Sequence, residues 1–444
     1  MKKVKKLLSL VLVFTFLFAL MGCSGGNNDT VNDSSTDAPA TNMQQDTTSG
    51  DTVKEDINAS LHSFWSADAP EVEATGEPIV IGGFACLTGA NSAGGNLVYR
   101  GTEMAVEWIN SHGGINGRPL EIIMYDDATT PEGAVKAVTR LMDEDEVSVI
   151  LGSHMTPNVL AAMDYTEEAG IPLVSLGTGL SCTRCGAEYT IRGTFSGYSM
   201  YPTMLDAMVD QGEKSVAFFY AETDSGQAAA NFFIQEGRFD DACIEVVETV
   251  PYPKAETDFT GHIAKALAKN PEAITIITAA NTEYSLFVKQ LRQQGFTGLV
   301  YGVENVGTHA VIETAGALAN GSVFTSAILA SPDPTTYTNE QAAYVVATYN
   351  EKYGELFSSE GTFRGWDGVM VIAQALSEVD DPADSEAIAE ALWNMKNYQG
   401  CQGVFDYTAR DGEGLPMVSK FMIQDESYLP YDRDAAAAMR GEGN

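Results

Sequence analysis

Short polar segments that follow apolar runs carry groups able to bind a small charged molecule. The first extends from Gly152 to Pro157, directly after the apolar run Val147–Leu151. Thr156 has the residue type of a helix N-cap, and Pro157 suits the first helical position. Free N–H groups at a helix start favour a carboxylate. Capping without any ligand is the commoner role of such a threonine, so both interpretations stay open.

Two further segments have the same setting, Ser175 to Gly179 and Gly302 to Asn305. In open α/β sheets, ligands bind beyond the carboxyl ends of the strands, so these loops are candidate binding loops. Glu304 is the acidic residue among them. A carboxylate buried between two domains requires a cation, because an unpaired buried charge is costly. The alternative is that Glu304 is an ordinary solvent-exposed glutamate in a loop.

The chain lacks the sequence patterns of common catalytic centres. Gly-x-Ser-x-Gly, Gly-x4-Gly-Lys-Ser/Thr and His-Glu-x-x-His are absent, and Gly82-Gly83 does not continue as a dinucleotide-binding glycine motif. Asp126 and Asp127 could pair in acid–base chemistry, but they follow an apolar run as a strand-end pair. We therefore expect no enzymatic activity, no cofactor and no metal, with an amidase- or hydrolase-type enzyme as an alternative.

The candidate loops belong to two series of strands that alternate with helices. About 370 residues follow the N-terminal region, too many for one ordinary core. The alternation predicts two doubly wound α/β lobes with parallel sheets. Strands are expected at 79–85, 120–125, 147–151 and 173–176, then at 215–220, 244–250, 273–278, 299–301 and 322–325. Helices are expected at 344–353, 366–376 and 387–395, followed by a hairpin of 404–407 and 418–423.

Residues 1–22 are predicted to be a signal peptide. Lysines precede Leu7–Met21, an apolar run of about 15 residues, shorter than the about 20 that span a bilayer. Leu20 to Cys23 resembles the bacterial lipobox, which implies diacylation of Cys23 and a lipoprotein on the outer face of the cell membrane. An ordinary signal peptide with an incidental cysteine is the alternative. Residues 23–77, polar and small, are expected to be a disordered tether.

Leu61–Trp65, an apolar run within that tether, is interpreted as residual sequence, with a docking strip as the alternative. The formal charge is −36, or −40 once the signal-peptide lysines are removed, which argues against nucleic acid as a partner. Cys182 and Cys185 have the spacing of a small local disulfide, and two free thiols are equally open. A zinc site is not expected, because the sequence contains no second pair of ligands with such spacing.

One stretch of the chain points to a family. Tyr99–Asp127 combines an amphipathic helix, the turn Gly113-Gly114 and an apolar strand that ends in two aspartates. With Phe84–Gly89 before it, this stretch resembles the opening of type I periplasmic solute-binding receptors of ABC transporters, of the branched-chain amino acid (leucine-, isoleucine- and valine-binding) type. The resemblance extends from Pro78 to Ile423.

The resemblance implies both a function and a domain organisation. It implies a monomeric receptor that captures an amino acid or similar ligand by lobe closure and delivers it to an ABC permease. A receptor of the same fold that reports to a membrane signalling protein is the alternative. Lobe 1 is expected to comprise residues 78–193 and 329–399, and lobe 2 residues 194–328 and 400–435. Three hinge strands are expected near 192–194, 326–331 and 400–403.

The resemblance also assigns ligand contacts. In the family, a hydroxyl residue at the position of Thr156 holds the ligand carboxylate, and an acidic residue at the position of Glu304 pairs with the ammonium. The loop from Ser175 resembles the family's Ser-Pro-Gly-Ala-Thr turn, in which a carbonyl and a threonine bind the ligand. Gly179 occupies the aligned threonine position here, so Thr178 is expected to substitute. The expected contacts are Thr156, Gly177, Thr178, Gly179, Glu304, Ser225 and Ala280.

Departures from the family pattern bear on the ligand. Gly94, Ser225 and Ala280 stand where leucine-binding relatives place tyrosines, and loss of aromatic walls enlarges a cavity. A plain leucine pocket is therefore not supported, and a larger or more polar amino-acid-like ligand is expected. Arg192 is expected to brace the crossing strands. Candidate replacement contacts are Trp366, Phe363, Tyr284 and Arg364, with core packing as the alternative for the aromatic residues.

Overall fold

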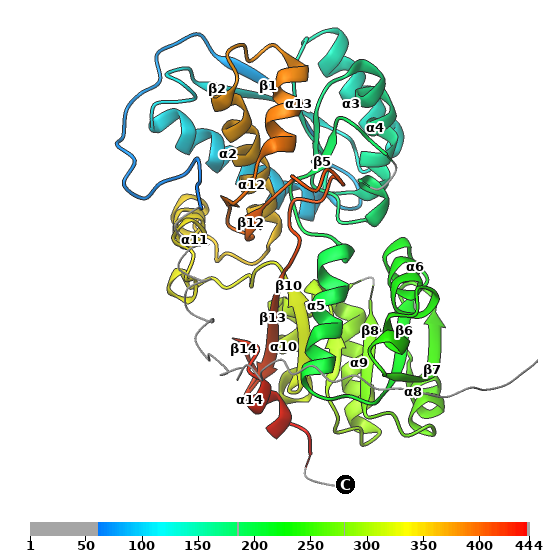
Figure 1. Cartoon of the computed structure of the whole chain (residues 1–444). Coiled ribbons are helices and arrows are strands. Elements are labelled where there is room, and N and C mark those ends of the chain that lie inside the picture. The colour runs from blue at the N-terminus through cyan, green and yellow to red at the C-terminus, as the bar shows by residue number, and fades with distance from the viewer. Residues whose placement is uncertain (1–60, 184–185, 279, 442–444) are drawn as a thin grey trace, which may run out of the picture. The chain divides into compact units, whose positions relative to one another are not determined.

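The computed structural model describes residues 61–183, 186–278 and 280–441, and the structural statements below concern these residues (Figure 1). The predicted signal peptide, Cys23 and residues 24–60 of the predicted tether lie outside them. Cys185 also lies outside, so its pairing with Cys182 stays a prediction. Within the described ranges, no helix is long and apolar enough to cross a membrane.

Lobe 1 is built on a five-stranded parallel sheet with the order β2-β1-β3-β4-β5. Its chain order reverses between β1 and β3, which is where ligands bind in doubly wound sheets. The elements are β1 (Ile79–Ala85), α2 (Ser92–Ser111), β2 (Leu120–Asp126), α3 (Pro131–Asp143), β3 (Ile150–Leu151), α4 (Thr156–Ala169), β4 (Leu173–Ser175), the 3-10 turn η1 (Leu180–Cys182) and β5 (Thr190–Arg192).

Lobe 2 contains a seven-stranded sheet with the order β14-β13-β10-β9-β8-β6-β7. Its parallel part, β7-β6-β8-β9-β10, repeats the strand order of lobe 1, with the reversal between β6 and β8. The elements are α5 (Gly197–Asp210), β6 (Ser215–Ala221), α6 (Asp224–Ala230), the π turn η2 (Asn231–Gln235), α7 (Arg238–Asp241), β7 (Glu245–Tyr252), α8 (Thr260–Leu267), β8 (Ala273–Ile277), α9 (Asn281–Gln293), β9 (Val300–Gly302), η3 (Glu304–Gly307), α10 (His309–Ala315), η4 (Gly316–Ala319) and β10 (Ser322–Ser326).

The chain then returns to lobe 1 through three helices and ends in lobe 2 (Figure 1). These elements are η5 (Pro334–Thr336), α11 (Glu340–Tyr353), α12 (Gly361–Glu378), α13 (Ser385–Asn394), β11 (Tyr398–Gln399), β12 (Val404–Phe405), β13 (Ser419–Gln424), β14 (Ser427–Pro430) and α14 (Arg433–Ala438). The fold class, the nine strands and the three late helices expected from the sequence are confirmed, apart from small shifts at their ends.

Helices α2 and α12 pack closely because glycines meet backbone at their contact. A Cβ on Gly101 would lie 1.9 Å from the carbonyl oxygen of Thr362, and a Cβ on Gly365 would lie 1.9 Å from that of Val98. Any larger residue at either position would force the helices apart. The close contact fixes α12, which carries Arg364, against the first sheet.

The third crossing between the lobes lies later than expected. The amides of Cys401 and Gln402 donate to the buried carboxylate of Asp367 in α12, at 2.8 and 2.9 Å. Farther along, the Arg192 amide donates to the Gly412 carbonyl at 2.8 Å. Residues 400–412 are therefore hydrogen-bonded to lobe 1, since the buried carboxylate of Asp367 accepts from them and the amide at the end of β5 donates to them.

The predicted hairpin of residues 404–407 and 418–423 is wrong. β12 pairs with β11, whereas β13 pairs with β10 and forms its hairpin with β14. Asp425 and Glu426 form that turn with φ values of 50° and 56°, the left-handed region that tight hairpins require. The two apolar runs look like hairpin partners in sequence, but the crossing between the lobes separates them.

The last part of the predicted tether packs on lobe 1. The amide of His62 donates to Asn397 at 3.1 Å, and the amide of Gln399 donates to His62 at 2.7 Å. The Trp65 ring lies 6.3 Å from that of Trp108 in α2, centroid to centroid. We name residues 61–77 the strap. Interpreting its apolar run as residual sequence is wrong, because these aromatic side chains bury apolar area.

Candidate functional site

A cavity of about 360 Å³ lies between the two lobes, at the carboxyl ends of strands from both sheets. Its size is at the lower end of the range typical of small-molecule sites. Five of the residues expected from the sequence line it: Thr156, Thr178, Gly179, Ser225 and Glu304. The remaining two, Gly177 and Ala280, are not among its lining residues.

The repeated strand order explains why these residues meet. Thr156 and Thr178 follow β3 and β4, the third and fourth strands of lobe 1 in chain order. Glu304 follows β9, the fourth strand of the equivalent series in lobe 2, and Ser225 follows β6, the first. The loops at the carboxyl ends of the strands of each sheet therefore lie on the same side of that sheet, and the cavity lies between the two sets of loops.

Thr156 is not the N-cap of α4, contrary to the sequence prediction. It is the first residue of the helix, and Met155 holds the cap position without a side-chain bond. The Oγ1 of Thr156 instead accepts a hydrogen bond from the Gly179 amide at 3.0 Å. That bond uses one lone pair of the oxygen, and the Thr156 hydroxyl also interacts with the Cys182 thiol.

Arg192 fixes the loop that carries Thr178. Its guanidinium donates to the carbonyls of Gly177 and Gly179 and pairs with Glu413, with Nε to Oε2 at 3.0 Å. The carbonyl of Gly177 is thus engaged with Arg192, and Gly177 does not line the cavity. The expected bracing role of Arg192 is confirmed. Within the described residues the hydroxyl of Thr178 makes no hydrogen bond and faces the cavity.

Glu304 carries the one carboxyl among the described lining residues of the cavity. Oε2 is buried and has no hydrogen-bond partner within the described residues, although the residue as a whole is partly exposed. Burial raises the pKa of this carboxyl to about 7, an effect that Arg364 opposes and Glu360 reinforces. Bringing a cation to Oε2 would satisfy the carboxylate and restore its ionised form.

Residues of lobe 2 that the sequence did not indicate complete the wall. Tyr201 of α5 is fully buried, and its hydroxyl donates to the Ser225 carbonyl at 3.1 Å. Gln227 of α6 lines the cavity just before the π turn η2, a feature that often marks functional sites. Ser196 caps α5 directly after the first crossing, and that capping signal could have placed the start of α5 in the cleft.

The aromatic candidates do not replace the missing tyrosines. Trp366, Phe363 and Tyr284 are fully buried in the hydrophobic cores, and the Tyr284 hydroxyl donates to Ser322 at 2.6 Å. Ala280 precedes α9 at its cap position. Trp366, Phe363 and Tyr284 are thus core residues, which is the alternative that the sequence analysis gave for them. Arg364 differs, because its charge acts on Glu304.

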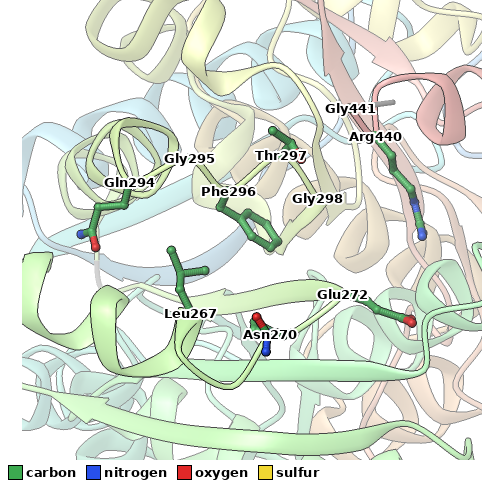
Figure 2. Close-up of a pocket in the computed structure, with 11 residues that line it drawn as sticks. Leu267, Asn270, Glu272, Gln294, Gly295, Phe296, Thr297, Gly298, Arg440 and Gly441 are labelled. Carbon is green, nitrogen blue, oxygen red and sulfur yellow. The ribbon is translucent and has the colours of Figure 1, made fainter. Parts of the chain in front are cut away.

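A second cavity, of about 480 Å³, lies in lobe 2 away from the first (Figure 2). Glu272 and Gly298 line it, and they precede β8 and β9, at the amino ends of parallel strands. Figure 2 shows Phe296 between these loops and Arg440 beside them. Arg440 is engaged with the buried Glu213. Ligands of doubly wound sheets bind at the opposite strand ends, so the interlobe cavity is the candidate site.

The described lining of the cavity presents polar groups that can hydrogen-bond a small charged molecule. Among its described lining residues, the polar groups are hydroxyls, one amide and one carboxyl, and none is histidine, cysteine or lysine. Two sheets of equal strand order, three crossings and a cavity between their carboxyl ends define a two-lobed binding protein.

Comparison with known proteins gives the family. The sequence profile of the periplasmic binding protein family matches residues 78–423, so the chain belongs to that family, as the resemblance indicated. Its members are periplasmic or extracytoplasmic solute-binding receptors. The strap and the residues from 424 onward lie outside the matched region.

Similar proteins include Leu/Ile/Val-binding protein homolog 3 of Brucella melitensis, 26% identical over 349 residues, which are 78% of this chain and 92% of that protein. The leucine-, isoleucine-, valine-, threonine- and alanine-binding protein of Pseudomonas aeruginosa is 25% identical over 309 residues, covering 69% and 79%. The solved leucine-binding protein LivK of Thermotoga maritima matches with a TM-score of 0.66 and 26% identity, covering 80% of this chain and 98% of that one.

Proposed function

We propose that this protein is an extracytoplasmic, lipid-anchored receptor that captures an amino acid or a similar ligand and delivers it to an ABC permease. The ligand lies in the interlobe cavity and is enclosed as the lobes close. Its carboxylate is directed to Thr156 and Thr178, and its ammonium to Glu304. The names of the relatives, which refer to amino acids, support the ligand class.

The observation that carries the proposal is the unpartnered Oε2 of Glu304. A buried carboxylate with no partner is unfavourable, and a ligand ammonium removes that cost. On the lobe 1 side of the cavity, Thr156 and Thr178 supply hydroxyls, and that of Thr178 makes no hydrogen bond within the described residues. Donors on one side and an acceptor on the other match the carboxylate and ammonium of an α-amino acid.

Thermal-shift screening against the common amino acids tests this function. A ligand at about a hundred times its dissociation constant stabilises the folded protein by roughly 2.7 kcal/mol, which raises the melting temperature by several degrees. N-acetyl derivatives and carboxamide derivatives of any hit provide controls, since each lacks one of the two charges. We expect both derivatives to lose the shift. Derivatives as effective as the parent amino acid would reject the proposed orientation.

A further inference from the structure

One glycine of the binding loop stands at a position where the backbone does not require glycine. Gly179 has φ −66° and ψ 139°, an extended conformation that any residue adopts. Gly179 lines the interlobe cavity, in the loop between β4 and η1. The reason for a glycine at this position therefore lies in the atoms around it rather than in its own backbone.

Thr156 occupies the space that a side chain at position 179 would need. A Cβ on Gly179 would lie 2.5 Å from Cγ2 and 2.6 Å from Oγ1 of Thr156. Optimal contact between carbon atoms is at about 3.5–4.0 Å, so both distances are too short. Rotation of the Thr156 side chain would not relieve the contact, because its Cβ would lie only 3.0 Å away as well. The missing side chain at position 179 thus makes room for the threonine at position 156.

The same two residues belong to a set of hydrogen bonds that fixes the loop. The Gly179 amide donates to Oγ1 of Thr156 at 3.0 Å, and the Gly179 carbonyl accepts from Nη2 of Arg192 at 2.8 Å. The carbonyl of Gly177 accepts from Nη1 of Arg192. The residues on both sides of Thr178 are therefore held in place by the protein itself.

Thr178 is the residue between these two fixed neighbours. Its hydroxyl makes no hydrogen bond within the described residues, and the residue lines the cavity. The position of this hydroxyl depends on the backbone of Gly179, which follows it directly. A side chain at position 179 would push the loop away from α4 and would move the Thr178 hydroxyl with it.

We propose that Thr156 and Gly179 form a size-matched pair that positions Thr178, and that Gly179 thereby determines the affinity for the ligand carboxylate. Gly179 is a positioning residue, because it acts through the loop and not through a side chain of its own. The inference rests on the proposed function, since it assumes that Thr178 binds the carboxylate.

A double-mutant cycle of Gly179 and Thr156 is the first test. The probe is the most tightly bound of the common L-amino acids, and calorimetric titration measures its affinity. We expect Gly179→Ala to weaken binding about 10- to 100-fold, because the displaced Thr178 loses a hydrogen bond to a charged group. Thr156→Gly removes the colliding side chain, so in that background Gly179→Ala should change the affinity less than about threefold. Equal losses in the two backgrounds would overturn the inference.

Gly261→Ala is the matched control. Gly261 lies in α8 of lobe 2, and a Cβ at this position would meet no atom within 4 Å. The variant should therefore leave the affinity unchanged. If Gly261→Ala weakened binding as much as Gly179→Ala, the loss would not come from the contact with Thr156, and the inference would fail.

A second cycle, of Gly179 and Thr178, separates positioning from stability. Thr178→Val removes the hydroxyl and keeps the shape of the side chain, and it should weaken binding about 10- to 100-fold in the wild-type protein. In Gly179→Ala, where the contact is already lost, Thr178→Val should cost less than about threefold. A purely structural role of Gly179 predicts the same loss in both proteins and would overturn the inference.

Folding supplies the readout if Gly179→Ala does not fold. Circular dichroism should then show that Gly179→Ala/Thr156→Gly folds again, and an unfolded double variant would overturn the pair. Wild-type binding that Gly179→Ala leaves unchanged would reject the inference while the proposed function stands. If no amino acid binds the wild-type protein, the proposed function fails as well.

Discussion

At the residue scale, the state of Glu304 links proton binding to ligand binding. In the free protein its pKa is raised from 4.5 to about 7, chiefly by burial. Because the folded value is the higher one, the free protein loses stability as the pH rises from 4.5 to 7. A bound ammonium reverses this effect, since it favours the carboxylate. Protons should therefore be released from Glu304 when the ligand binds near or below neutral pH.

We predict that affinity for an amino acid falls as the pH decreases through 7, by up to about tenfold per pH unit. Arg364 and Glu360 are the charged groups acting on Glu304, and the imidazole of His154 is already neutral above pH 4. Titration calorimetry at pH 5.5 to 8, in buffers of different ionisation enthalpy, measures the affinity and the released protons.

Glu304→Gln is the matching variant, because it keeps the size of the side chain and removes its charge. We expect it to weaken binding by roughly 30-fold or more and to remove the pH dependence below 7. An unchanged pH profile in Glu304→Gln would mean that another group binds the proton, and unchanged affinity would reject the ammonium contact.

At the element scale, a buried polar network connects the binding loop to the crossings. Arg192 ends β5, and its partner Glu413 lies on the segment that leads to the third crossing. The Ser196 hydroxyl, at the first crossing, donates to Glu413 at 2.8 Å. The loop of Thr178 is bound to the same guanidinium. The ligand loop and the segments at the crossings thus share one buried hydrogen-bond network.

Arg192→Met should destabilise the protein by about 3–5 kcal/mol, since it leaves Glu413 buried without its cation. Urea unfolding monitored by circular dichroism measures this change. Arg238→Met is the control, because Arg238 and Glu236 form an exposed pair whose loss should cost less than about 1 kcal/mol. Similar losses for the two variants would show that the Arg192 network contributes little.

At the scale of the whole molecule, the strap determines where the tether reaches the folded domain. His62 pairs with residues 397 and 399, so residues 23–60 alone separate the predicted anchor from lobe 1. Two acyl chains on Cys23 would hold the protein stably at a bilayer, whereas one chain binds only marginally.

Cys23→Ser should therefore release the protein from the membrane fraction, while its ligand affinity stays unchanged. Fractionation of cells followed by immunoblotting measures the distribution, and calorimetry of the released protein measures the affinity. Retention of Cys23→Ser in the membrane fraction would contradict lipidation at this residue. Wild-type protein processed in the same strain is the control.

The sequence by itself determined the elements and the family. Alternating apolar runs and glycine turns are local signals, so strands such as Ile79–Ala85 appear where the pattern predicts them. The loops that follow β3, β4 and β9 were identified for the same reason, because strand ends can be found without knowing the packing. Most of the expected lining residues, including Thr156 and Glu304, come from those loops.

Only the tertiary structure decided which groups in those loops are available. The Thr156 hydroxyl accepts from Gly179, and the Gly177 carbonyl accepts from Arg192, contacts between residues distant in sequence. The hairpin of 404–407 and 418–423 failed for the same reason, since strand partners depend on the crossing between lobes. Burial then decided the chemistry: a loop glutamate becomes a binding group only where packing removes its water.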